Sequence, residues 1–186
     1  MKIKLGFFSA CTLLAWFLTN PLYGAAALMA ATLHELGHLW AAKQLGISFS
    51  EMAITPFGAT LTPTSCLGSY TDELLVAAAG PFVNLLSAMI IWPLHVGALS
   101  FFRFFTLASL FLGLLNLLPV SGFDGGRILS CLFPHASKRV LALTSFLTLF
   151  FLWSFSVYLL LRVGNSLSLF VFSCSLFCKL FVRTTI

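Results

Sequence analysis

Six long apolar runs divide this sequence, and they limit what it can fold into more than any other feature. They occupy residues 5–20, 22–45, 73–94, 97–119, 137–161 and 165–182, separated by short breaks that carry Pro, Gly, Asn or charge. A helix that crosses the hydrocarbon core of a bilayer needs about 20 apolar residues. With 60% hydrophobic and 8% charged residues, a chain of 186 residues lacks the polar surface of a soluble domain. We therefore predict an all-α polytopic membrane protein with about six transmembrane helices.

The segment between the second and third runs has a different pattern. Residues 47–63 are rich in β-branched residues, with Pro56 and Gly58 as turn formers, which predicts a short β-hairpin or a re-entrant loop after the second helix. No linker rich in Pro, Ser or charge divides the chain, so we expect a single domain over residues 1–186. The net charge of +5 on so apolar a chain fits anchoring at the inner face of a membrane and argues against nucleic acid as a partner.

The basic residues indicate the orientation, because Lys and Arg are retained on the cytoplasmic side of a membrane. With six spans and the N-terminus inside, Arg103 and Arg162 lie on the outer side. The other eight basic residues lie on or near the cytoplasmic side: Lys2, Lys4, Lys43, Arg127, Lys138, Arg139, Lys179 and Arg183. We therefore predict a multi-pass protein of the cell membrane with both termini in the cytoplasm. The first run could instead be a signal peptide, since small residues at 25–27 offer a cleavage site.

The second run contains His34-Glu35-Leu36-Gly37-His38, which is the H-E-x-x-H pattern. Residues four apart share one face of a helix, so both imidazoles can bind the same zinc ion. Glu35 then reaches the attacking water and is the predicted general base. Ionisable residues at membrane depth are costly and mark functional sites. The pattern therefore predicts one zinc ion per chain and a hydrolytic reaction.

A hydrolytic zinc site has three protein ligands and one open position, so a third ligand must lie elsewhere in the chain. Asp124 is the favoured residue, because Pro119 ends a helix before it and three glycines permit an irregular path from Pro119 to Gly126 at membrane depth. The predicted topology also places Asp124 on the same side of the membrane as the two histidines. The candidates ranked below it are Glu51, His95, His135 and two residues expected in the first turn of the third helix, Asp72 and Glu73.

These residues give the chain a resemblance to the site-2 proteases, a family of intramembrane zinc metalloproteases. The run from His34 to His38 is similar to the zinc-binding signature of that family, and Asn116-x-x-Pro119-x-x-x-x-Asp124-Gly125 is similar to its second signature. Residues 80–84, Gly-Pro-Phe-Val-Asn, resemble its middle motif. Neither a PDZ domain nor a nucleotide-binding domain is recognisable, so the chain most resembles the small branch typified by stage IV sporulation protein FB.

The resemblance implies a catalytic core over about residues 22–130. It implies hydrolysis of peptide bonds in membrane-associated or membrane-tethered regulatory proteins near the cytoplasmic face. The expected partners are such a substrate, the lipid bilayer and regulatory membrane proteins.

A helical substrate must unwind before its carbonyl can react, and Asn84 and Asn116 are predicted to bind its extended backbone. Hydrogen bonding between helices is the other role open to both amides. The edge of the predicted hairpin would add a substrate strand by backbone pairing, and a structural plug is the alternative there.

Two other functions stay open. In a prenyl-protein protease with the same pattern, Glu73 would be the third ligand. In a non-catalytic zinc-binding membrane protein or transporter, Glu35 would be a ligand or a proton relay. A Glu35→Gln protein that binds zinc but hydrolyses nothing would favour the protease.

Overall fold

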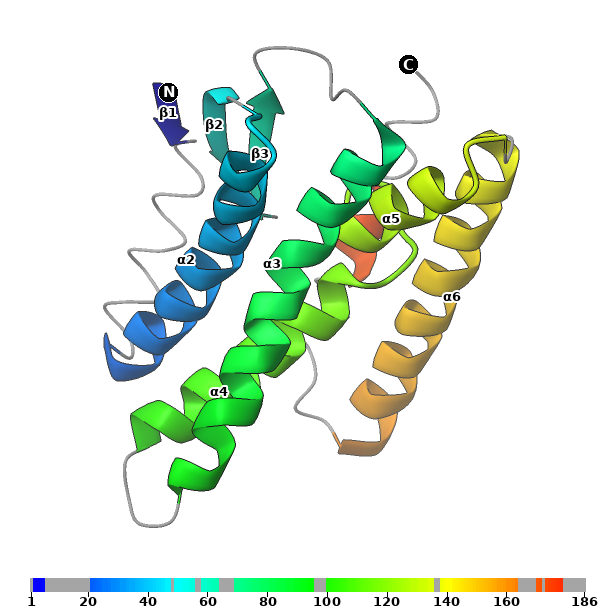
Figure 1. Cartoon of the computed structure of the whole chain (residues 1–186). Coiled ribbons are helices and arrows are strands. Elements are labelled where there is room, and N and C mark those ends of the chain that lie inside the picture. Colours follow the sequence, from blue (N-terminus) through cyan, green and yellow to red (C-terminus); the bar gives the residue numbers. More distant parts are fainter. Residues whose placement is uncertain are drawn as a thin grey trace. The chain divides into compact units, whose positions relative to one another are not determined.

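The computed structural model describes residues 2–5, 21–47, 49–55, 58–63, 69–95, 100–135, 138–163, 170–171 and 173–178. The chain divides into two compact units, Met1–Leu117 and Leu118–Ile186. The first unit contains β1 (Lys2–Leu5), α2 (Pro21–Gln44), β2 (Phe49–Thr55), β3 (Gly58–Pro63), α3 (Tyr70–Ile91), the 3-10 helix η1 (Trp92–His95) and α4 (Ser100–Asn116) (Figure 1). The second contains α5 (Asp124–Leu132), α6 (Lys138–Val163) and the helical residues 170–171 and 173–178.

In the first unit α2, α3 and α4 pack against one another, and α2 and α3 run in opposite directions (Figure 1). α2 buries a row of residues spaced four apart: Ala26, Ala30, His34, His38 and Ala42. α3 buries a row with the same spacing: Val76, Gly80, Asn84 and Ala88. Small residues let two helix backbones approach closely, and a Cβ added to Gly37 would lie 2.7 Å from the carbonyl oxygen of Ala79. The two rows therefore set an antiparallel register in which each histidine has a defined neighbour on α3.

The start of α3 follows the sequence prediction. The side-chain oxygen of Ser69 accepts a hydrogen bond of 3.0 Å from the backbone N–H of Thr71, which caps the helix. Asp72 and Glu73 lie in the first turn, where the helix dipole favours negative charge. The position predicted for these two acids is confirmed.

β2 is the central strand of a three-stranded sheet with the order β1-β2-β3. β3 pairs with it antiparallel, with Thr55 opposite Gly58, and β1 pairs with it in parallel, with Lys2 opposite Glu51. Pro56, the expected turn former, lies outside the described residues. β1 has no counterpart in the sequence prediction, where its lysines only flank the first apolar run. Because β2 is paired on both sides, the open edges of this described sheet belong to β1 and β3.

In the second unit, a non-helical segment leads into α5. Gly122 has a φ of 105°, a backbone conformation that favours glycine. The sequence predicted an irregular path as far as Gly126, and this was wrong, because α5 begins at Asp124. A Cβ on Gly126 would collide with the carbonyl oxygen of Val120, so this glycine permits a close backbone approach rather than an irregular path. The N–H of Ser121 also donates to the side-chain oxygen of Ser145 on α6, at 2.9 Å.

Two described helices are long and apolar enough to cross a membrane, judged by length and composition: residues 70–91 in α3 and 139–162 in α6. The apolar part of α4, Phe101–Asn116, is shorter. The first predicted run, 5–20, lies almost entirely outside the described residues, and much of the last, 165–182, does too. The number of six spans therefore stays a prediction.

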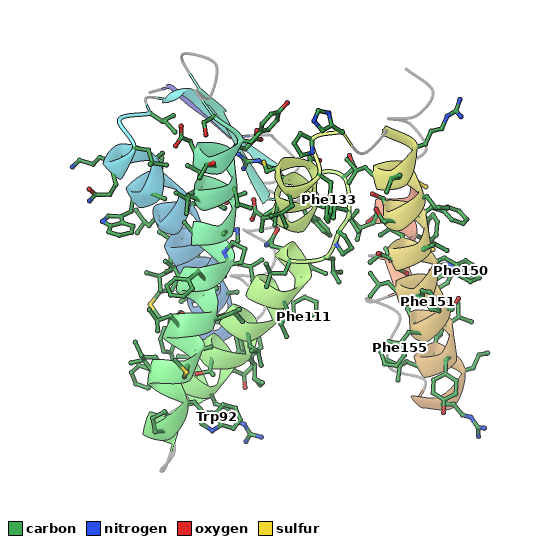
Figure 2. All side chains as sticks on the ribbon, turned by 45° about the vertical axis from the view of Figure 1, so that its right-hand side comes forward. Trp92, Phe111, Phe133, Phe150, Phe151 and Phe155 are labelled. Carbon is green, nitrogen blue, oxygen red and sulfur yellow. The ribbon has the colours of Figure 1, made fainter. Side chains whose placement is uncertain are left out.

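Large apolar side chains are exposed on helices of both units. On α3, the exposed fraction is 68% for Met89 and 63% for Phe82; on α6, it is 81% for Leu161 and 70% for Phe151. Figure 2 labels further exposed rings, among them Phe111 on α4. Monomeric soluble proteins rarely expose large contiguous apolar surfaces, so these helices suit contact with lipid.

Candidate metal centre

Both histidines of the H-E-x-x-H pattern lie on the buried face of α2. Their exposed fractions are 5% for His34 and 4% for His38, and their Nε2 atoms lie 3.2 Å apart. The two rings are nearly perpendicular, with an interplanar angle of 85°. The prediction that residues four apart bring both imidazoles to one helix face is therefore confirmed.

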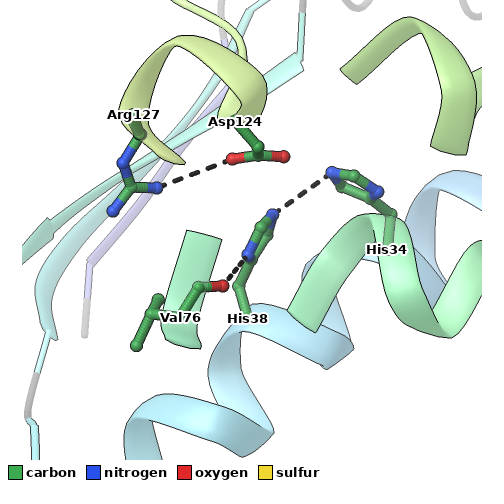
Figure 3. A network of polar contacts seen from close by, with 5 residues as sticks. All are labelled: His34, His38, Val76, Asp124 and Arg127. Carbon is green, nitrogen blue, oxygen red and sulfur yellow. Dashed lines mark hydrogen bonds and ion pairs between the residues drawn. The ribbon is translucent and has the colours of Figure 1, made fainter. Parts of the chain in front are cut away.

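The ring of His38 is oriented by the backbone of α3. Its Nδ1 lies 2.7 Å from the carbonyl oxygen of Val76, as Figure 3 shows. A carbonyl oxygen can only accept a hydrogen bond, so Nδ1 carries the hydrogen and donates it. The neutral ring then has a free electron pair on Nε2, which is the form that binds a metal ion.

Gly80 provides the space in which that nitrogen lies. A Cβ at this position would collide with Nε2, Cε1 and Cδ2 of His38. Glycine is therefore needed here for the close approach of α3 to the imidazole, and not for an unusual backbone angle, because Gly80 lies inside the helix.

The first unit also contains the predicted general base, Glu35, and the two predicted substrate-binding residues, Asn84 and Asn116. Asn84 is completely buried on α3, and its Nδ2 lies 3.3 Å from Nδ1 of His34. Glu35 follows His34 directly on α2 and is half-buried. Asn116 is the last residue of α4, is half-buried, and donates from Nδ2 to the carbonyl oxygen of Leu112 at 3.0 Å. The first unit thus brings Asn84 to the histidine pair through a direct contact.

Asp124 is the first residue of α5 in the second unit. It is buried, with 8% exposed, and its Oδ1 lies 3.6 Å from Nη1 of Arg127 (Figure 3). A carboxylate at the N-terminus of a helix is favoured by the helix dipole. His135, one of the lower-ranked candidates, lies in the turn after α5 and is exposed.

Sequence reasoning did not find the residues that support these groups. The carbonyl of Val76 and the hydroxyl of Ser145 carry no local signature, since neither belongs to a metal-binding pattern. Gly80 belongs to the motif at residues 80–84, for which the sequence indicated no role of this glycine. The four-residue spacing of Gly80 and Asn84, which matches that of His34 and His38, is the signal that could have indicated their contacts.

His34 and His38 in the first unit supply two buried imidazoles, and Asp124 in the second supplies one buried carboxylate; zinc binds side chains of both kinds. A family model described as peptidase family M50 matches this chain over residues 23–97 and 93–160. These matches cover more than half of the chain and include all three residues. The chain belongs to peptidase family M50. This confirms the family that the sequence indicated, since M50 contains the site-2 proteases.

Curated relatives of this M50 chain are similar to it over part of their length. A zinc metalloprotease of Methanocaldococcus jannaschii is 28% identical over 107 residues, which is 54% of this chain and 31% of the relative. Stage IV sporulation protein FB of Bacillus subtilis is 30% identical over 113 residues, which is 57% of this chain and 38% of the relative. The matched region thus spans about a third of the length of each curated relative.

A solved structure has the same fold as this M50 chain. It is the site-2 protease from Methanocaldococcus jannaschii, with a TM-score of 0.65 and 20% sequence identity. The match covers 96% of this chain and 88% of the solved chain.

Proposed function

We propose that this M50 chain is a zinc metallopeptidase of the cell membrane. Its substrates are membrane-associated or membrane-tethered regulatory proteins, which it cleaves near the cytoplasmic face. The observation that carries the proposal is the approach of the two Nε2 atoms to 3.2 Å on a buried helix face. One ring is already turned by the Val76 carbonyl into the form that binds a metal ion.

The residues present fit a zinc ion. Zinc prefers imidazole nitrogen and carboxylate oxygen, and His34, His38 and Asp124 would hold one ion per chain. The hydrogen bond from His38 to Val76 and the space left by Gly80 both favour Nε2 of His38 as a ligand. When bound, zinc would polarise the scissile carbonyl and make a water molecule acidic enough to lose a proton near neutral pH.

Glu35 is the general base of the proposed reaction. It follows His34 on α2 and is half-buried. In the H-E-x-x-H pattern this Glu is the residue that acts as general base beside the two histidines. Its carboxylate takes the proton from the water as the water oxygen bonds to the peptide carbonyl carbon. The same proton then passes to the leaving nitrogen as the C–N bond breaks.

The substrate backbone is bound by amides and by a strand edge in this proposal. Asn116 is half-buried at the end of α4, and the side-chain amide of Asn84 has a second polar atom besides the one that faces His34. Among the described strands, those with an open edge are β1 and β3, because β2 is paired on both sides. A substrate segment that has left its helix would satisfy its backbone groups on one of these edges.

The chain acts in this proposal as a single multi-pass domain with both termini in the cytoplasm. The support is the distribution of basic residues, eight on one side and two on the other. The exposed apolar faces of α3 and α6 support contact with lipid. Cysteines introduced singly into a cysteine-free variant would test the orientation, through labelling of intact cells by an impermeant reagent. We expect labelling beside Arg162 and none at the N-terminus, and the reverse would overturn the orientation.

Replacing Glu35 with Gln tests the proposed reaction. Gln keeps the size and shape of the side chain but cannot take a proton, so cleavage should fall by about 10²–10⁴-fold. Zinc content of the purified protein should stay at the wild-type level, since Glu35 is not one of the proposed ligands. Peptide cleavage and zinc analysis on the same sample measure both. Cleavage at the wild-type rate would refute the mechanism.

A further inference from the structure

Asn84 is the buried polar residue on α3 that the proposed reaction does not require as a metal ligand or base. Its side chain is fully buried, and Nδ2 lies 3.3 Å from Nδ1 of His34. Its other amide atom, Oδ1, is buried and has no hydrogen-bond partner within the described part of the chain. A buried carbonyl oxygen without a partner is unfavourable and calls for an explanation.

The contacts around the two histidines determine which atom donates the hydrogen in each hydrogen bond. An amide nitrogen can only donate, so Nδ2 of Asn84 donates to Nδ1 of His34. A neutral His34 then carries its hydrogen on Nε2 and donates it to Nε2 of His38, 3.2 Å away. His38 in turn donates from Nδ1 to the carbonyl oxygen of Val76. In this arrangement Nε2 of His34 has no electron pair for a metal ion.

Metal binding by Nε2 of His34 requires the opposite arrangement. The hydrogen must then lie on Nδ1, and it needs an acceptor in the position that Asn84 occupies. The oxygen and nitrogen of an amide have nearly the same size, so a half-turn of the side chain exchanges them within the same space. After that half-turn, Oδ1 faces Nδ1 of His34 and gains the partner that it lacks.

We propose that Asn84 is a positioning residue for His34, whose Oδ1 accepts the Nδ1–H of that histidine and thereby keeps Nε2 free to bind the metal ion. The register of α2 and α3 fixes this contact, because Asn84 is one helical turn from Gly80, which lies against His38. The two histidines thus receive equivalent acceptors from α3: a backbone carbonyl for His38 and a side-chain carbonyl for His34. The inference rests on the zinc site of the proposed function.

The test compares two replacements of Asn84 by zinc affinity, measured on the purified protein in detergent by competition with a chelating dye. Asn84→Leu keeps the approximate size and removes the acceptor, so zinc affinity should fall about 10–100-fold. Asn84→Asp has only acceptor oxygens, so it should bind zinc about as well as the wild type. Ser87→Ala is the matched control one turn along α3. It removes a hydroxyl that bonds to the backbone carbonyl of Asn84 and should leave zinc affinity unchanged.

Cobalt(II) in place of zinc provides a second readout, because its visible absorption reports the ligand arrangement rather than activity. The spectrum should be retained in Asn84→Asp and altered in Asn84→Leu. Wild-type affinity and spectrum in Asn84→Leu would overturn the inference. Loss of zinc from a folded Asn84→Asp protein would also overturn it, and that variant decides the question even where the Leu variant does not fold. Wild-type protein that binds no zinc would refute the proposed function itself.

Discussion

In the first unit the candidate ligands are two histidines, and neighbouring groups on α3 orient both rings. His38 contacts a backbone carbonyl and His34 contacts the amide of Asn84, through two helices that approach closely along rows of small residues. In the second unit the candidate ligand is a carboxylate, and its position depends on the backbone path at Gly122 and on the close approach at Gly126.

The difference follows from the chemistry of the two side chains. An imidazole has two nitrogens that exchange donor and acceptor roles, so a ligand ring needs a partner that fixes where its hydrogen lies. A carboxylate has two equivalent acceptor oxygens and needs only to be held in place. Orientation therefore matters most in the first unit, and backbone position matters most in the second.

The largest expected effect comes from removing the carboxylate of the second unit. Asp124→Ala should reduce zinc affinity by more than the roughly 100-fold typical of losing a supporting residue, because it removes a ligand. Glu73→Ala should retain zinc, since Glu73 lies in the first turn of α3. Metal analysis of both purified variants measures the difference. The opposite pattern would favour the prenyl-protease alternative, and it would mean that the second unit supplies no ligand to the metal.

A smaller loss of zinc affinity is expected when a methyl group is added beside His38 in the first unit. In Gly80→Ala the new methyl group would collide with the His38 ring, which must turn away from the carbonyl of Val76. Zinc affinity should fall about 10–100-fold, as for loss of a supporting group. Gly113→Ala is the control, because its Cβ would lie 3.2 Å from the side chain of Leu85 and 3.3 Å from the carbonyl oxygen of Pro81. These overlaps need shifts of only a few tenths of an ångström, and neither involves a histidine. Equal zinc affinities in the two variants would show that His38 does not need its present orientation.

The smallest effect is expected at Ser145, which supports the segment before Asp124. Its hydroxyl oxygen accepts from the N–H of Ser121 and donates to the carbonyl of Leu141 at 2.7 Å. Ser145→Ala removes bonds worth about 1 kcal/mol each, so zinc affinity should weaken several-fold. Ser156→Ala removes another buried hydroxyl of α6, which bonds to the Trp153 carbonyl and to Ser173, and should leave zinc affinity unchanged. Equal effects in both variants would mean that Ser145 only stabilises the helix.

The sequence predicted the histidine pair because the spacing of four residues and the helical pitch are local properties. It could not predict the partner of His38, because every residue has a backbone carbonyl and that of Val76 has no distinguishing feature. The burial of Asn84, in contrast, has a signal in the sequence that could have predicted it. Its row on α3 and the row on α2 are both visible as small or polar residues at intervals of four within apolar runs.

The errors have a common physical cause, which is that contacts with other backbone segments overrode the preferences of single residues. Gly125 and Gly126 are poor helix formers, so the sequence indicated an irregular path where α5 begins. Within this helix Gly126 lies close to the carbonyl of Val120, where a side chain would collide. The sequence did not predict β1 for a similar reason. This segment has four residues, two of them lysines, and it forms a strand because β2 pairs with it.

The two neighbours of β2 differ in how far along the chain they lie from it. β3 follows directly, with Thr55 opposite Gly58, whereas Lys2 of β1 pairs with Glu51, beyond the whole of α2. Closing a longer loop costs more chain entropy, by about 0.6 kcal/mol for each doubling of its length. We therefore expect the hairpin to form before β1 pairs with it, and β1 to separate from the sheet before the hairpin opens. When β1 leaves, the backbone of β2 becomes available to another strand without any change in the hairpin.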